Sequence, residues 1–277
     1  MKTLHILIGI LFNTFILAMT VIWWIQSKHL ETIDIILSSL GLTRLAVLIT
    51  LVIRNVYLPN VLKHEETFFI SIVFVTCCSQ CFGTVLCVFY CVKISNYSNS
   101  FFMYMKSKIS KMVPWLLLGS VIFSFMFSLM VNCIAEKVIP NNSINGTEDG
   151  SIEMTIQNFI LYMAGPCLPF FLFCVSISLL IRSLFLHIRS MAGDGSWFAN
   201  PQIQVHINAI KTMVSFLIFY MVFFASSFLI NIVFQEHILQ AVFQLLAGSY
   251  PSLHSVILVM SNRRFKETLL RFLSCAI

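Results

Sequence analysis

Charged side chains are scarce in this sequence of 277 residues, where Asp, Glu, Lys and Arg together make up only 10%. Soluble domains carry about 25% charged residues, so this chain lacks the polar surface that a globular protein needs in water. Hydrophobic residues make up 58% of the chain and the mean hydropathy is +0.91, which points to lipid as the solvent. The net charge of +6 is weak evidence for a nucleic-acid partner, and we expect none.

Patterns typical of catalysis and metal binding are also missing. The sequence contains no Walker-type phosphate loop and no His-Glu-x-x-His pair, and its nine cysteines match no zinc template. Most of these cysteines lie in apolar runs, where a small polarizable side chain serves packing. The histidines at 187, 206 and 254 share no metal-like spacing. We therefore expect no enzyme activity, no cofactor and no metal site.

Seven apolar segments are long enough to cross a bilayer, which needs about 20 helical residues. They cover approximately 4–25, 33–53, 68–92, 112–134, 158–181, 212–234 and 239–260. The sequence therefore predicts an all-α membrane protein with one seven-helix domain over residues 1–277. After the last segment, bases alternate with Phe265, Leu269, Leu270 and Phe272. This pattern predicts a short amphipathic tail helix at the lipid surface, with its bases near anionic headgroups.

The distribution of basic residues predicts the orientation in the membrane. Twelve Lys and Arg lie in the tail and in the loops after the first, third and fifth segments, against four on the opposite side. The positive-inside rule then places the N-terminus outside the cell and the C-terminus in the cytosol. Glycosylation sequons begin at Asn141 and Asn145, in the longest external loop. The sequon at Asn96 falls on the cytosolic side, and we expect it to stay unmodified.

Several residues and motifs are missing from the seven segments, and their absence argues against other classes of membrane protein. Asp34 is their only acidic residue, whereas proton-coupled carriers place carboxylates in the membrane interior. The last segment contains no lysine for a retinal Schiff base, and no Asp-Arg-Tyr or Asn-Pro-x-x-Tyr signature of rhodopsin-like receptors follows the third or ends the seventh segment. A seven-helix carrier or channel remains an alternative from a different functional class.

Other motifs occupy those places and extend over nearly the whole chain. They are DIILSSLGLTR at 34–44, TVLCVFYCVKISNYS at 84–98, LPF at 168–170, SLLIRSL at 178–184, HINAIKTMVSFL at 206–217 and PSLHSVIL at 251–258. Together and in this order they resemble the bitter taste receptors (taste receptor type 2), a family of G-protein-coupled receptors. The closest rival resemblance is to the vomeronasal type 1 pheromone receptors, for which we would expect different patterns in helices 2 and 7.

The resemblance implies a plasma-membrane receptor with a ligand pocket that opens outward between helices 3, 5, 6 and 7. Matching positions make the ligand-binding residues Phe69, Ile72, Val73, Thr76, Phe223, Phe224 and Gln244. Such a pocket suits uncharged amphipathic small molecules bound with micromolar affinity, on the order of −8 kcal/mol. Ile72 and Cys81 stand where the family usually has tryptophan, so the resemblance leaves the ligand preference open.

The resemblance also implies a heterotrimeric G protein of the gustducin type as the cytosolic partner. The residues that would face it are Phe89, Tyr90, Lys93, His187, Met191, His206 and Lys211. The bases at this end also follow from the positive-inside rule alone. G-protein coupling is therefore an implication of the resemblance and not of the charges.

Arg44 lies near the middle of the second apolar segment. A charged arginine at that depth costs about 2.5–3.5 kcal/mol on insertion scales, so we expect it to face the interior of the bundle. No carboxylate is available there, and the partners must be neutral. In the resembling family this arginine joins helices 1, 2 and 7, which implies an interhelical polar network of Asn13, Arg44, Ser252, His254 and Ser255.

Overall fold

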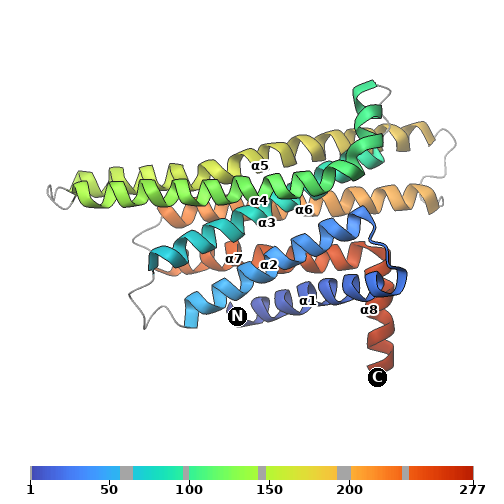
Figure 1. The fold of residues 1–277 in the computed structure, drawn as a ribbon, viewed down its shortest axis with the longest axis horizontal. Helices are drawn as coiled ribbons and strands as arrows, with labels where there is room; N and C mark the ends of the chain where they lie inside the picture. Colours follow the sequence, from blue (N-terminus) through green and yellow to red (C-terminus); the bar gives the residue numbers. More distant parts are fainter. Residues whose placement is uncertain are drawn as a thin grey trace.

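The computed structural model describes residues 2–56, 65–95, 100–142, 148–191, 201–232 and 237–276. Regular structure in these ranges is entirely helical (Figure 1). The helices are α1 (Lys2–Ser27), α2 (Thr32–Val56), α3 (Glu65–Ile94), α4 (Ser100–Asn142), α5 (Glu148–Met191), α6 (Pro201–Ile232), α7 (His237–Ser261) and α8 (Arg263–Ala276). In α1 to α7, seven stretches are long and apolar enough to cross a membrane, which confirms the predicted seven-helix membrane fold.

The helices extend beyond the apolar segments that predicted them. The largest differences are in α4, which begins twelve residues earlier than expected, and in α5, which is longer at both ends. Hydropathy locates the part of a helix that lies in the hydrocarbon. The backbone hydrogen-bond ladder continues into polar residues until a turn stops it, and hydropathy does not detect that point.

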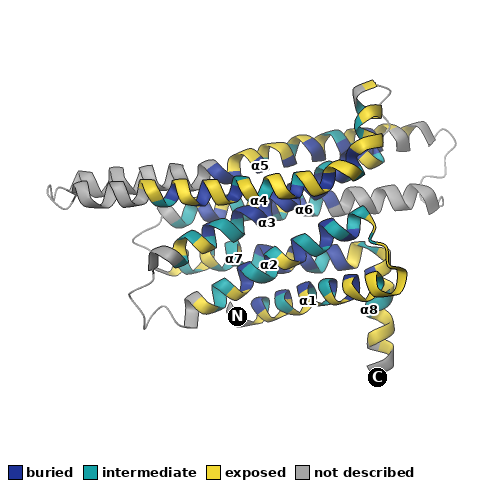
Figure 2. Ribbon diagram, viewed as in Figure 1, coloured by how far each residue is buried: buried dark blue, intermediate teal, exposed yellow. Residues whose placement is uncertain are grey.

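Helix α3 occupies the centre of the bundle, in contact with α2, α4 and α5. Most of its residues are buried, whereas α1 and α4 expose one long face (Figure 2). Small side chains, among them Ser79, Gly83 and Thr84, line α3 and let neighbouring helices approach closely. Around this centre, α7 packs between α1 and α6, and buried residues of all eight helices form one main core cluster.

The outward faces of the bundle are apolar. On α4, Trp115, Leu118 and Ile122 are exposed at steps of three and four residues, so they share one face of the helix. In water such a stripe would be an aggregation hazard. In a bilayer the same stripe contacts lipid tails, which agrees with the seven membrane spans.

Prolines interrupt the hydrogen-bond ladders of α5, at Pro166 and Pro169, and of α7, at Pro251. Hydroxyl groups contact the backbone at two of these sites. Thr84 Oγ1 on α3 donates to the carbonyl oxygen of Pro169 at 3.0 Å, and Ser255 Oγ lies 2.7 Å from that of Pro251. Within a bilayer, polar backbone groups need partners of this kind.

Helix α8 runs across the end of the bundle (Figure 1). Its Phe265 is fully buried, with the ring centroid 4.8 Å from that of Trp23 and 6.2 Å from that of Phe15 on α1. The sequence predicted Phe265 as an apolar residue of the tail helix, and the structure packs it against the aromatic residues of α1. Leu270 and Phe272, further along α8, are exposed, as expected for the lipid-facing side of an amphipathic helix.

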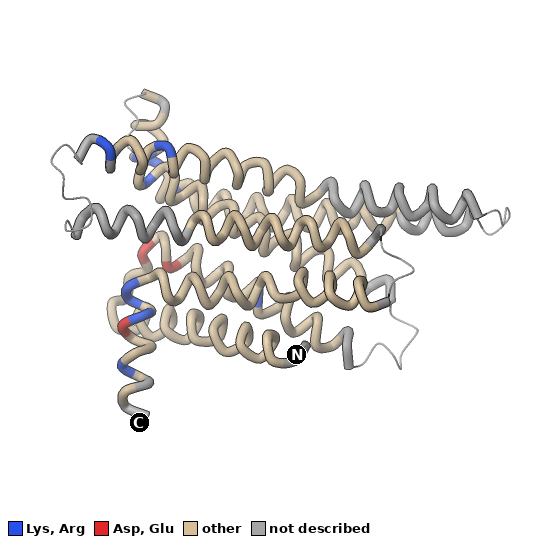
Figure 3. Tube along the Cα trace, turned by 180° about the vertical axis from the view of Figure 1, so that it is seen from behind, with Lys and Arg blue, Asp and Glu red and all other residues tan. Residues whose placement is uncertain are grey.

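Basic residues gather at the end of the bundle that carries α8 (Figure 3). In the described part of the chain this set comprises Lys28, Lys93, Lys106, Lys108, Lys111, Arg182, Arg189, Arg263, Arg264, Lys266 and Arg271. Arg44 lies midway along α2, away from this end. The assignment of this end to the cytosol remains a prediction from the positive-inside rule.

Candidate functional site

Aromatic side chains from α5, α6 and α7 form a continuous cluster inside the bundle. The buried ring of Tyr220 on α6 lies at its centre. Its centroid is 5.2 Å from Phe170 and 5.0 Å from Phe173 on α5, both edge to face, and 5.8 Å from Tyr250 on α7. These separations and orientations are favourable for aromatic pairs. The cluster therefore joins three of the four helices between which the ligand pocket was predicted.

The predicted ligand residues Phe223 and Phe224 belong to this cluster. The Phe223 ring lies 5.2 Å from that of Tyr250, and the Phe224 ring stacks on that of Phe170 at 5.1 Å. Both side chains are partly buried, so they contact neighbouring helices and keep some accessible surface. The structure thus brings the predicted α6 pair together with aromatic residues of α5 and α7.

The predicted ligand residues of α3 contact a different neighbour. Val73 is buried in a small cluster with Phe127 and Val131 of α4, and Ile72 packs against the same cluster. Thr76 is partly buried and Phe69 is 41% exposed. Helix α4, which was absent from the predicted pocket, thus packs against two of its predicted α3 residues.

The predicted α7 ligand residue, Gln244, is exposed. It precedes the buried Tyr250 by six residues on the same helix, which is about 9 Å along the axis. The prediction therefore named an accessible residue of α7 and did not name the buried Tyr250 of the aromatic cluster.

Sequence reasoning also missed Phe170 and Tyr220, which occupy the centre of the aromatic cluster. A signal for Tyr220 was present, because it precedes Phe223 and Phe224 by three and four residues and so lies on the same helical face. For Phe170, which directly follows Pro169, the sequence offered no comparable signal.

A polar junction joins α1, α2 and α7. Arg44 is fully buried, and its Nη1 donates to Ser255 Oγ at 3.3 Å. The Ser255 hydroxyl lies 2.9 Å from Asn13 Oδ1, to which it donates, and Asn13 Nδ2 donates to the carbonyl oxygen of Gly9 at 2.7 Å. Asn13, Arg44 and Ser255, three of the five residues predicted for this network, are thus connected by hydrogen bonds across three helices.

The other two predicted network residues lie apart from these hydrogen bonds. Ser252 is buried one turn before Ser255, and its hydroxyl has no hydrogen-bond partner among the described residues. His254 is buried between rings, 3.8 Å from the Phe216 centroid and stacked on Tyr250 at 5.5 Å. Neither of its ring nitrogens has a partner in the described part of the chain. His254 therefore extends the aromatic cluster.

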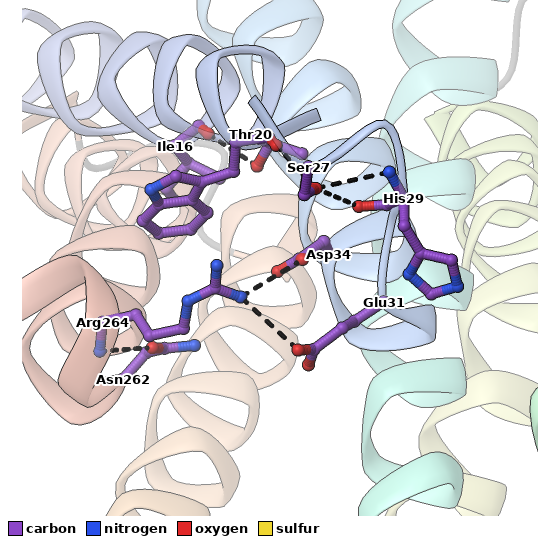
Figure 4. A network of polar contacts seen from close by, with 9 residues as sticks. Ile16, Thr20, Ser27, His29, Glu31, Asp34, Asn262 and Arg264 are labelled. Atoms are coloured by element: carbon purple, nitrogen blue, oxygen red, sulfur yellow. Dashed lines mark hydrogen bonds and ion pairs between the residues drawn. The ribbon is translucent and has the colours of Figure 1, made fainter. Parts of the chain in front are cut away.

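A second polar cluster lies at the α8 end of the bundle (Figure 4). Arg264 Nη1 is 3.5 Å from Asp34 Oδ2 on α2 and 3.7 Å from Glu31 Oε1, just before that helix. The same guanidinium lies over the ring of Trp23 on α1. Asn262 Oδ1 accepts a hydrogen bond from the Arg264 backbone N–H at 3.0 Å and so caps the start of α8. The sequence had assigned Arg264 only to the lipid headgroups.

Three of the residues predicted to face a G protein have described side chains, all on α3. Phe89 is buried and Tyr90 partly buried, with ring centroids 6.2 Å apart, and Lys93 is exposed. Phe89 therefore belongs to the core. The side chains of His187, Met191, His206 and Lys211 lie outside the described part of the structure. The same is true of the predicted glycosylation sites, the Asn141 side chain and Asn145.

The family model described as taste receptor protein (TAS2R) matches residues 1–277. Human taste receptor type 2 member 2 is 30% identical over 281 residues, which cover 96% of this chain and 91% of the human protein. Human taste receptor type 2 member 8 is 30% identical over 97% of this chain and 92% of its own length. Taste receptor type 2 member 4 of Pongo pygmaeus is similarly 30% identical over 94% of this chain and 91% of its own length.

Proposed function

This chain belongs to the taste receptor type 2 family, and from that membership we propose that it is a plasma-membrane receptor for bitter-type small molecules. It is a multi-pass membrane protein and a receptor, not an enzyme. Family membership argues against the alternative assignment to the vomeronasal type 1 pheromone receptors. It also disfavours a seven-helix carrier, in agreement with the single acidic residue within the spans.

The observation that carries the proposed ligand site is the aromatic cluster of α5, α6 and α7. Its rings provide a large apolar contact area, and the Tyr220 hydroxyl, buried without a partner among the described residues, provides a hydrogen-bonding group. Apolar walls with a few convergent polar groups are typical of small-molecule sites. Uncharged amphipathic agonists would bind there through ring contacts and one or two hydrogen bonds, with micromolar affinity, on the order of −8 kcal/mol.

The α3 residues would contribute in two ways. Phe69 and Thr76 retain accessible surface and could contact an agonist directly, as could Gln244 on α7. Val73 is 3% exposed against α4 and would instead position α3. Ile72 lies between these two cases, since it packs partly on the same α4 cluster.

Signalling would follow from α7, which carries parts of both sites. Tyr250 belongs to the aromatic cluster, and Ser255, five residues later, accepts the Arg44 hydrogen bond. An agonist that displaces Tyr250 would thereby alter the junction of α1, α2 and α7. It can shift the receptor toward its active arrangement only by as much as it binds that arrangement better. In the active arrangement α5 and α6 would open on the cytosolic side to a G protein of the gustducin type.

The test is a calcium-release assay in cells that express the receptor with a gustducin-like chimeric G protein, screened against a broad panel of bitter compounds. Once an agonist is found, Phe170→Ala should lower its potency about tenfold, because the variant loses the stacked contact with Phe224 and the edge contact with Tyr220. Surface expression is measured alongside, to separate binding from folding.

The adjacent residue offers a matched control. Phe171 is 63% exposed on the outer face of α5, so Phe171→Ala should leave agonist potency unchanged. Equal losses in both variants would contradict the proposed ligand site. Agonist responses that persist without the G protein would contradict the proposed coupling and leave the ligand site standing.

A further inference from the structure

The backbone of α5 is weakened immediately before Phe170, a central residue of the aromatic cluster. Pro166 and Pro169 lie inside the helix, and each lacks the N–H that would bond to a carbonyl group one turn earlier. The Phe170 ring stacks on that of Phe224 at 5.1 Å and meets that of Tyr220 edge to face at 5.2 Å. Because this turn of α5 has fewer hydrogen bonds of its own, the position of the Phe170 ring depends on contacts with neighbouring helices.

Two neighbouring helices contact the backbone of this turn. On the α4 side, a Cβ added to Gly165 would lie 2.3 Å from a ring carbon of Phe127, so α4 packs directly against the α5 backbone. On the α3 side, Thr84 Oγ1 donates to the carbonyl oxygen of Pro169 at 3.0 Å, and Thr84 is 5% exposed. Packing of this kind restricts distance, whereas a hydrogen bond also restricts direction. The Thr84 contact can therefore fix the orientation of the peptide group that joins Pro169 to Phe170.

Thr84 does not need α5 to satisfy its own hydroxyl. The carbonyl oxygen of Gln80, one turn earlier on α3, lies 3.1 Å from Thr84 Oγ1 and is a second acceptor. Thr20 on α1, which is also buried, uses a bond of this kind, to the Ile16 carbonyl at 2.9 Å. A threonine hydroxyl has one hydrogen to donate, so Thr84 donates fully to only one acceptor at a time. The bond to Pro169 therefore serves α5, and it can be exchanged for the bond to Gln80 at little cost when α5 moves.

We propose that Thr84 is a positioning residue of the ligand site. Its hydroxyl holds the Pro169 carbonyl and so sets the orientation in which Phe170 presents its ring to an agonist. Thr84 acts through Phe170, since it is buried against α5 and does not itself contact the agonist. The inference rests on the proposed ligand site in the aromatic cluster of α5, α6 and α7, and it adds α3 to the helices that shape that site.

The first measurement is agonist potency in the calcium-release assay, with surface expression recorded for each variant. Thr84→Val keeps the branched side chain and removes the hydroxyl, and it should lower potency about fivefold, the effect of one neutral hydrogen bond. Thr84→Ser restores the hydroxyl and should respond as the wild type does. Thr20→Val, which removes a buried hydroxyl bonded within α1, should leave potency unchanged.

A double variant separates positioning of Phe170 from a general structural role. If Thr84 acts through Phe170, adding Thr84→Val to Phe170→Ala should lower potency no further, because the ring that Thr84 positions is already gone. A further fivefold loss in the double variant would overturn the proposal. An equal loss in Thr20→Val would overturn it as well, since any buried threonine would then have the same effect.

The second measurement needs no agonist. Amide hydrogen exchange of the purified receptor, followed by mass spectrometry, reports how often a helical turn opens. In Thr84→Val the α5 amides from Phe170 to Phe173 should exchange about fivefold faster, whereas Thr84→Ser and Thr20→Val should match the wild type. Unchanged exchange in Thr84→Val would overturn the proposal even if potency falls. Faster exchange together with normal potency in Phe170→Ala would support the bond between α3 and α5 and contradict the proposed ligand site, so the two failures are distinguishable.

Discussion

The guanidinium carbon of Arg264 lies 4.2 Å from the centre of the Trp23 ring, which attaches the start of α8 to the end of α1. The attachment is reinforced from two sides. Phe265, the next residue, packs its ring against the same tryptophan, and Asp34 on α2 faces the guanidinium. A guanidinium can stack on an aromatic ring and pair with a carboxylate at the same time. The Arg264 side chain therefore joins α8 to both α1 and α2.

Replacing Arg264 should therefore lower the stability of the receptor. Arg264→Ala removes the stacking contact and leaves the buried Asp34 carboxylate unpaired. The guanidinium is about half exposed, so the expected loss is modest, about 1–2 kcal/mol. Thermal unfolding of the purified receptor measures it. A double-mutant cycle with Trp23→Leu should show coupling between the two positions, and additive losses would contradict the contact.

The neighbouring Arg263 provides the control for that experiment. Arg263 Nε lies 2.6 Å from Glu267 Oε1, and both residues are exposed. This pairing lowers the pKa of Glu267 and raises that of Arg263. A carboxylate with a lowered pKa stabilises the protein above its usual range and loses that effect as pH falls through the folded-state pKa. At neutral pH, Arg263→Ala should change the unfolding temperature little, since exposed ion pairs contribute little. Any small difference between Glu267→Gln and the wild type should vanish in acid.

The contact between Gly165 and Phe127 provides a test of packing between α5 and α4. A Cβ on Gly165 would lie 2.3 Å from a ring carbon of Phe127, whose ring is buried and stacked near Phe123. Gly165→Ala should destabilise the receptor by about 1–3 kcal/mol through overpacking. Gly119→Ala on α4 meets no atom within 4 Å and serves as the control. Equal unfolding temperatures for the two variants would contradict the close approach of these helices.

The polar junction predicts the effect of removing Ser255. Ser255→Ala takes away the acceptor of the Arg44 hydrogen bond and the donor to Asn13. Leaving buried polar groups unsatisfied costs about 1–3 kcal/mol each, so surface expression and signalling should fall sharply. Arg44→Leu should likewise lose signalling or surface expression. A fully normal receptor with either change would show that the junction does not link the helices.

The predicted orientation can be tested through the sequons. If the loop after the fourth span faces outward, Asn141→Gln or Asn145→Gln should reduce the size shift that enzymatic deglycosylation produces on a gel. Asn96→Gln, on the predicted cytosolic side, should leave that shift unchanged. The opposite pattern, with modification at Asn96, would reverse the orientation.

Much of the fold could be predicted from the sequence because a bilayer imposes its own length scale. Seven apolar segments of about 20 residues can only be spanning helices, since every backbone polar group must be satisfied within its segment. The inward direction of Arg44 followed from the same physics, because a guanidinium cannot face lipid tails at that depth. The resemblance named Phe223 and Phe224 as ligand residues, and their contact with a ligand remains a prediction.

Only the tertiary structure determined which residues of the neighbouring helices the inward-facing side chains contact. Helical periodicity assigns Ser252 and Ser255 to one face of α7, but the axial register of α7 against α2 selects Ser255 as the partner of Arg44. The packing of α4 on α3 directs Val73 away from the aromatic cluster, and the aromatic residues of α1 draw Phe265 into the core. The sequence by itself determined that seven apolar helices cross the membrane and that Arg44 faces the interior of the bundle. The register between helices depends on contacts between residues far apart in the chain, so only the folded bundle could determine it.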